Sequence, residues 1–163
     1  MKNQKNTETI VAEITKLLVQ RKQTIGIAES CTGGLLGHQI TEYPGASLFF
    51  LGGIICYANE VKRSLVGVTE QALVSDGAVS ESVVIEMARG IRDALGSDYG
   101  LAISGIAGPG GGSAGKPVGT VFIGWADKNS AQAFRYLFSG TRSLIKQQAV
   151  RQALEIIQQE IDT

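Results

Sequence analysis

The stretch TIGIAESCTGGLLGHQI, residues 24–40, decides the fold because it predicts a short buried strand, a tight turn and a helix in direct succession. Residues 24–28 are apolar and rich in β-branched side chains, as expected for a strand that is buried on both faces. Gly33 and Gly34 allow a tight turn before Leu35, Leu36 and Ile40, which share one face of a helix. Such a strand–helix unit is typical of α/β domains.

In the rest of the chain, predicted helices and strands first alternate, and two predicted strands then follow one another directly. Apolar periodicity predicts further helices over 7–22, 59–65, 81–95 and from 142 onward, capped by Asn6 or Thr7, by Ser80 and by Thr141. It predicts further strands over 48–57, 99–103, 118–126 and 131–138. A hairpin turn over 127–130 would make the last two strands antiparallel. We therefore expect a layered α/β domain with a mixed central sheet, and one domain over residues 1–163.

Composition excludes several classes of protein. The 163 residues fit one domain, and Lys plus Arg equals Asp plus Glu at 15 each with no basic stripe, so we expect no nucleic-acid partner. No apolar run approaches 18 residues and the N-terminus does not resemble a signal peptide, so we expect no membrane association and a cytoplasmic protein. Two separated cysteines and a single histidine offer neither a disulfide framework nor a zinc site.

Ser30 is the first candidate nucleophile, because it lies where a strand passes into a helix and backbone N–H groups are unpaired. The alternative is that Ser30 is an ordinary N-cap. A serine hydroxyl needs a neighbouring base. His38 lies about 12 Å further along the helix axis, too far to serve, and we interpret it as an ordinary helix residue.

Lysine is the remaining type of base, and Lys62 lies in the first turn of a predicted helix that follows a strand. It could accept a proton only if burial or a nearby cation lowers its pKa from about 10.4. The alternative is a surface lysine that pairs with solvent or Glu60. Tyr57, at the end of the preceding strand, could donate a hydrogen bond or relay a proton, or could simply pack.

Cys31 is a rival nucleophile, since a helix N-terminus lowers the pKa of a thiol. A packed, inert thiol is the alternative, and Cys56, within an apolar strand, is expected to lie in the core.

A glycine-rich segment from Ser104 to Gly115 offers backbone N–H groups to a phosphate or carboxylate. It matches neither the P-loop nor the dinucleotide-binding pattern, and a flexible surface loop is the alternative. Ser104 and Lys116 could add a hydroxyl and a charge. Arg142, at the start of the last helix, could bind a phosphate together with the helix dipole, or could be a solvated arginine.

Five sequence blocks in this order resemble the CinA C-terminal domain family, whose stand-alone bacterial members are nicotinamide-nucleotide amidohydrolases. The blocks are AESCTGG (28–34), YANEVK (57–62), GAVS (77–80), SGIAGP (104–109) and KPVGTV (116–121). The resemblance implies a three-layer α/β/α sandwich that deamidates nicotinamide mononucleotide (NMN) to nicotinate mononucleotide and ammonia, without a metal or a cofactor. It also implies a homodimer or higher homo-oligomer.

The resemblance assigns Ser30 as the catalytic hydroxyl, with Lys62 and Tyr57 as the groups that activate it. Substrate binding is expected from Thr32, Gly33, Gly34, Ser104, Gly105, Ala107, Gly108 and Arg142, and the N–H groups near Thr32 and Gly33 could stabilise an oxyanion. The sequence departs from the family pattern at Ala58, Thr141 and Lys146. A hypothesis of another class stays open: a non-catalytic mononucleotide-binding or competence- or DNA-damage-associated accessory module.

Overall fold

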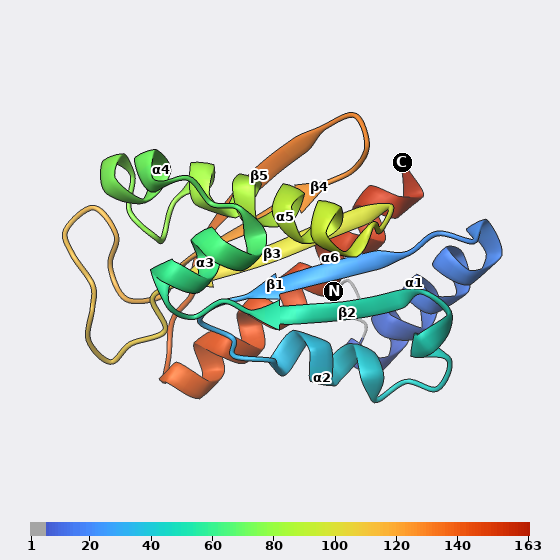
Figure 1. Cartoon of the computed structure of the whole chain (residues 1–163). Helices are drawn as coiled ribbons and strands as arrows, with labels where there is room; N and C mark the ends of the chain where they lie inside the picture. Colours follow the sequence, from blue (N-terminus) through green and yellow to red (C-terminus); the bar gives the residue numbers. More distant parts are fainter. Residues whose placement is uncertain (1–5) are drawn as a thin grey trace.

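The computed structural model describes residues 6–163 and contains one five-stranded sheet with the strand order β2-β1-β3-β4-β5 (Figure 1). The strands are β1 (Ile25–Glu29), β2 (Phe50–Ile55), β3 (Tyr99–Gly105), β4 (Thr120–Ala126) and β5 (Ala131–Leu137). β1 pairs in parallel with β2 and β3, whereas β3, β4 and β5 are antiparallel neighbours. The expected mixed sheet is therefore confirmed, including the hairpin between β4 and β5.

Helices cover both faces of this sheet (Figure 1). One face carries α1 (Thr7–Arg21), α2 (Leu35–Thr41) and α6 (Arg142–Asp162). The other carries α3 (Asn59–Val66), α4 (Glu70–Ser75) and α5 (Glu81–Leu95). The result is the three-layer α/β/α arrangement that the resemblance implied, with α4 and a short 3₁₀ helix, Ala46–Leu48, as elements that the sequence had not indicated.

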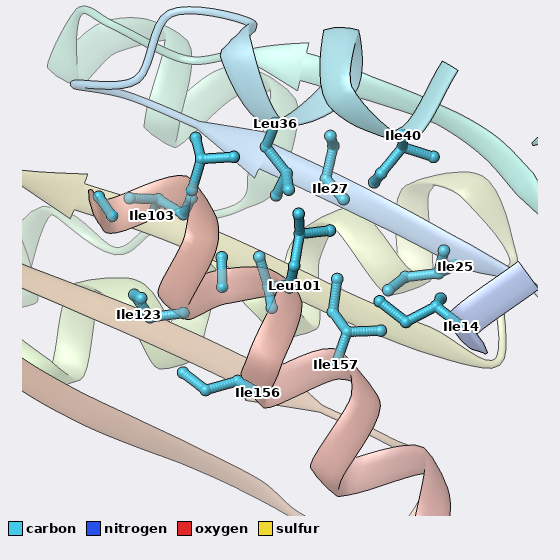
Figure 2. Close-up of a cluster of buried hydrophobic side chains, with 14 of the residues drawn as sticks. Ile14, Ile25, Ile27, Leu36, Ile40, Leu101, Ile103, Ile123, Ile156 and Ile157 are labelled. Carbon is cyan, nitrogen blue, oxygen red and sulfur yellow. The ribbon is translucent and has the colours of Figure 1, made fainter. Parts of the chain in front are cut away.

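The central strands place large side chains on one face and small ones on the other. Figure 2 shows isoleucines and leucines of β1, β3 and β4 packing against α1, α2 and α6. The opposite face is lined by glycine and alanine where α5 lies on it, at Gly26, Ala28, Gly100, Ala102, Gly124 and Ala126. A Cβ added at Gly100 would lie 2.0 Å from the Ala88 carbonyl oxygen, and one at Gly124 would lie 2.2 Å from that of Val84. Close approach of α5 therefore requires glycine at these two positions.

Side-chain caps begin most of the long helices as predicted. Asn6, Ser80 and Thr141 each accept a hydrogen bond from a backbone N–H of the helix that follows. α2 differs, since it begins only at Leu35, behind a four-residue turn. Its N-cap is Gly34, with φ +98° and no side-chain cap. Ser30 is therefore not the N-cap of this helix, and that interpretation was wrong.

β2 contains one residue more than the part of β1 with which it pairs. Ile25 pairs with Phe50 and Gly26 with Gly52, so Leu51 is an extra residue in the ladder. From that point the pairing continues without a break to Glu29 and Ile55. The register at the carboxyl ends of β1 and β2 therefore depends on this bulge.

Candidate active site

The candidate site lies at the carboxyl ends of the three parallel strands, where α/β sheets commonly bind ligands. Ser30 follows β1, and Cys56 and Tyr57 follow β2. Ser104 and Gly105 end β3. Because β1 lies between β2 and β3, residues that are far apart in the sequence meet around Ser30.

Ser30 and Lys62 are in direct contact. The Lys62 Nζ lies 3.0 Å from the Ser30 Oγ and donates to the carbonyl oxygens of Cys56, at 2.8 Å, and Tyr57, at 3.0 Å. The Lys62 side chain is only 1% exposed although α3 is otherwise a polar helix. The alternative of a surface lysine paired with solvent or Glu60 is therefore wrong.

The surroundings of Lys62 favour its neutral form. Burial lowers the pKa of Lys62 from its ordinary 10.5, and the Cys56 and Cys31 thiols oppose this shift more weakly. A neutral amine has two N–H bonds and one lone pair. The two carbonyl oxygens accept the N–H bonds, and the lone pair can accept the hydroxyl proton of Ser30. A serine and a neutral amine in this arrangement can act chemically as a nucleophile and its general base.

Glu29 is a functional candidate that sequence reasoning missed. Its side chain is 2% exposed. One carboxylate oxygen accepts from the Thr32 hydroxyl at 2.6 Å and from the N–H groups of Gly34 and Leu36, both at 3.1 Å; the other accepts from the Gly37 N–H at 2.9 Å. The signal was a lone acidic residue at the end of an apolar strand, directly before a glycine-containing turn.

These contacts determine which backbone N–H groups at the start of α2 are available to a ligand. The Glu29 carboxylate occupies the N-terminus of α2, so it is not an open anion site. The Gly33 N–H donates to the Ser30 carbonyl oxygen and is also occupied. The N–H of Thr32 has no hydrogen-bond acceptor among residues 6–163, so of the two expected oxyanion donors it is the one that no protein group occupies, although Thr32 itself is 0% exposed.

Cys31 is a buried thiol with a raised pKa, not an activated one. Burial raises its pKa from 9.0 to about 11, which outweighs the smaller lowering effects of its own backbone N–H, Lys146 and Arg142. The expectation that the helix start would lower this pKa was wrong, because Glu29 occupies that position and the side chain is only 6% exposed.

We expect Cys31→Ala to keep catalytic activity within about threefold of wild type, since a thiol at pH 8 with a pKa of about 11 is almost entirely protonated and unreactive. Treatment of the native protein with iodoacetamide at pH 8 should label Cys31 only slowly and leave turnover intact. Rapid loss of activity that Cys31→Ala prevents would instead show that the thiol takes part in the reaction.

The glycine-rich segment is fastened to the body of the protein at several points. Arg142 donates to the Gly108 carbonyl oxygen at 2.8 Å, and Lys116 donates to that of Asp76 at 2.6 Å. The Ser104 hydroxyl is buried and donates to the Ala78 carbonyl oxygen at 2.7 Å. Ser104 thus fixes the 77–80 block, whereas Ala107 is buried in the hydrophobic cluster that α1, α2 and α6 cover.

Two of the predicted glycines of this segment are closely packed, Gly105 against β4 and Gly108 against Val118, which precedes β4. A Cβ added at Gly105 would lie 2.7 Å from the Val121 Cγ2, and one at Gly108 would lie 2.5 Å from the Val118 Cγ1. These glycines bring the backbone close to the sheet. Gly108 also connects to the candidate site through Arg142.

Two cations from α6 border the turn that carries Ser30. Arg142 donates to the Tyr57 hydroxyl at 3.2 Å, and Tyr57 is 61% exposed. Lys146 lies one turn further along α6, with its Nζ 3.8 Å from where a Cβ on Gly33 would be. Tyr57 therefore meets Lys62 through its backbone carbonyl and Arg142 through its hydroxyl.

Within residues 6–163, no three His, Cys, Asp or Glu side chains gather closely enough to hold a metal ion. None of the helices there combines the length and the apolar character required to cross a bilayer.

Comparison with known proteins identifies the family to which the chain belongs. The model of the CinA C-terminal domain matches residues 7–161. A CinA-like protein of Endomicrobium trichonymphae is 43% identical over 156 residues, covering 96% of this chain and 36% of that protein. A CinA-like protein of Gloeothece citriformis is 52% identical over 136 residues, covering 83% of this chain and 32% of that protein. The chain thus spans about a third of the length of these curated relatives.

Solved structures agree over the whole domain. A CinA superfamily protein from Klebsiella pneumoniae superposes with a TM-score of 0.92 at 34% identity, covering 97% of this chain and 99% of that one. A competence/damage-inducible protein from Agrobacterium tumefaciens gives a TM-score of 0.93 at 32% identity and covers 100% of both chains. Since the matched region includes every strand and helix around Ser30 and Lys62, the chain belongs to the CinA C-terminal domain family.

Proposed function

We propose that this chain hydrolyses the carboxamide of nicotinamide mononucleotide to nicotinate mononucleotide and ammonia, with Ser30 as nucleophile and Lys62 as general base. The observation that carries the proposal is the 3.0 Å contact between the Ser30 Oγ and a fully buried lysine amine. A buried lysine whose pKa is lowered, beside a serine at the ligand-binding edge of a sheet, is a recognised combination for amide hydrolysis.

The first half of the reaction forms an ester. Lys62 takes the hydroxyl proton as the Ser30 Oγ attacks the amide carbon, and the carbonyl oxygen becomes an oxyanion near the free N–H of Thr32. The C–N bond then breaks, and Lys62 returns the proton to the leaving nitrogen, which departs as ammonia.

The second half regenerates the enzyme. A water molecule gives a proton to Lys62 and attacks the nicotinoyl ester on Ser30, and the ester bond breaks to release the carboxylic acid product. The proton returns from Lys62 to the Ser30 Oγ. The net reaction consumes one water and releases one ammonia, and the 3.0 Å contact between the Lys62 Nζ and the Ser30 Oγ supports the proton transfers that it requires.

The phosphate of the substrate is assigned in this proposal to Arg142 and Lys146. Both lie on the first turns of α6 beside the 30–34 turn, close enough that their charges act on Cys31. Lys146 makes no hydrogen bond or ion pair within residues 6–163. The Tyr57 hydroxyl, in contact with Arg142, is assigned to the mouth of the site rather than to the proton transfer.

Lys146→Met is expected to raise the KM for NMN about tenfold and to change kcat by less than threefold, because loss of one phosphate-binding cation removes roughly 1.4 kcal/mol of binding. The KM for the nucleoside without phosphate should not change. The matched control is Lys16→Met, an exposed position on α1, which should leave both constants unaltered. A fall in kcat with unchanged KM would contradict this assignment.

An ammonia-release assay across pyridine mononucleotides, with purified chain and no added metal, tests the proposal directly. Release from NMN that depends on Ser30 supports it. Tight NMN binding without turnover would instead favour the mononucleotide-binding module. The homo-oligomer and the cytoplasmic location stay predictions.

A further inference from the structure

We propose that Glu29 is a positioning residue of the site, whose buried carboxylate holds the turn that presents Ser30 to Lys62. This inference rests on the proposed function, because it assigns Glu29 to the reactivity of the same serine.

The chain leaves Glu29, forms the turn that carries Ser30, and returns to the Glu29 side chain. The carboxylate accepts hydrogen bonds from the Thr32 hydroxyl and from the N–H groups of Gly34, Leu36 and Gly37. All four donors follow Ser30 in the chain. The serine therefore lies in a loop that is closed by the side chain of the residue before it.

The backbone of Glu29 connects the same turn to the base. The Glu29 carbonyl oxygen accepts from the Cys56 N–H at 2.8 Å, and the carbonyl of Cys56 in turn accepts from the Lys62 Nζ. On the β3 side of this turn, the Ser30 N–H donates to the Ile103 carbonyl oxygen at 2.9 Å. Glu29 is thus linked to both partners of the Ser30–Lys62 contact.

The carboxylate replaces a cap that the sequence does not otherwise supply. Gly34, the N-cap of α2, has no side chain, and three of the donors to Glu29 are N–H groups at or near this helix start. A buried carboxylate is stable here because it accepts four hydrogen bonds and faces the positive end of the helix. Neutral glutamine has the same shape, but its NH₂ group would face an N–H donor.

The experiment compares Glu29→Gln with wild type in three measurements: steady-state kinetics on NMN, thermal unfolding, and the crystallographic distance between the Ser30 Oγ and the Lys62 Nζ. We expect kcat to fall about 100-fold with KM within threefold, since a displacement of about 1 Å costs about that factor. The distance should exceed 3.5 Å. Glu8→Gln, an exposed glutamate in the first turn of α1, is the matched control and should leave all three unchanged.

A second variant keeps the inference testable if Glu29→Gln does not fold. Thr32→Val removes only the hydroxyl that donates to Glu29 at 2.6 Å, and we expect kcat to fall about tenfold with unchanged KM. Unchanged kcat in the folded variant, or a Glu29→Gln structure that keeps the 3.0 Å contact, would overturn the inference. If wild type releases no ammonia from NMN, the proposed function fails, and the distance measurement still decides the role of Glu29.

Discussion

Replacing Ser30 with alanine is expected to lower kcat for ammonia release from NMN by about 10⁴-fold or more, with little change in NMN affinity. Loss of the nucleophile in hydrolases of this type costs this much because the residual site can only orient substrate and stabilise charge. Within residues 6–163, the only hydrogen bond of the Ser30 hydroxyl is the one to Lys62, so the thermal unfolding temperature should stay close to that of wild type.

Binding and turnover must be measured separately for this variant. Calorimetric titration gives the NMN affinity, and coupled ammonia detection gives kcat. Ser64→Ala, at an exposed serine of α3, is the matched control and should turn over normally. Turnover by Ser30→Ala within tenfold of wild type would rule out a serine nucleophile and return attention to direct attack by water.

Lys62→Met is expected to reduce kcat by a similar factor, because methionine fills the buried space but cannot accept a proton. Groups that act as one unit are not additive, so the Ser30→Ala, Lys62→Met double variant should be no slower than either single variant. Lys62→Arg should not restore turnover, since a guanidinium stays charged. Lys16→Met is the control for loss of a lysine charge. If the fold-losses in kcat of the two single variants multiplied in the double variant, Ser30 and Lys62 would act independently, and this result would contradict a serine–lysine pair.

The same lysine predicts two pH dependences of defined sign. Because burial lowers the pKa of Lys62 below 10.5, kcat/KM for NMN should rise with pH through this lowered pKa as the amine becomes neutral. The free energy of unfolding should also rise with pH between the folded-state pKa and about 10.4, since in that window the unfolded chain binds the extra proton. Lys62→Met should remove this part of the stability slope, which urea titrations at several pH values would measure.

The layers of this fold were predictable because they follow from periodic burial. Residues 24–28 and 99–103 are apolar runs that are too short for helices. The composition of residues 127–130, which is typical of a turn, predicts the hairpin. α4 was missed because six residues carry too little periodicity to stand out from a loop. The turn expected at Gly33 and Gly34 does precede α2, but glycine provides no side-chain cap signal, and this is why Ser30 was open to interpretation as an N-cap.

The pairing of Ser30 with Lys62 was predictable only as a hypothesis. Nothing within α3 marks Lys62 as buried, since its exposure is decided by α5 and by the strands that approach from elsewhere in the chain. The role of Glu29 depends on donors up to eight residues away, which meet its carboxylate only after the turn has folded. Tertiary packing determines the burial of Lys62, whereas the conformation of the 30–34 turn determines the contacts of Glu29.

The bulge in β2 makes the site depend on a residue count. With Leu51 as the extra residue, Ile55 pairs with Glu29 and the chain then delivers the Cys56 carbonyl to Lys62. A deletion after Gly52, beyond the bulge, would move every residue that follows it by about 3.3 Å and turn each side chain to the opposite face. Insertions and deletions cannot be absorbed there as they can in the exposed 127–130 hairpin turn. We therefore expect the number of residues between positions 50 and 62 to be the same in relatives that keep the contact between the serine and the lysine.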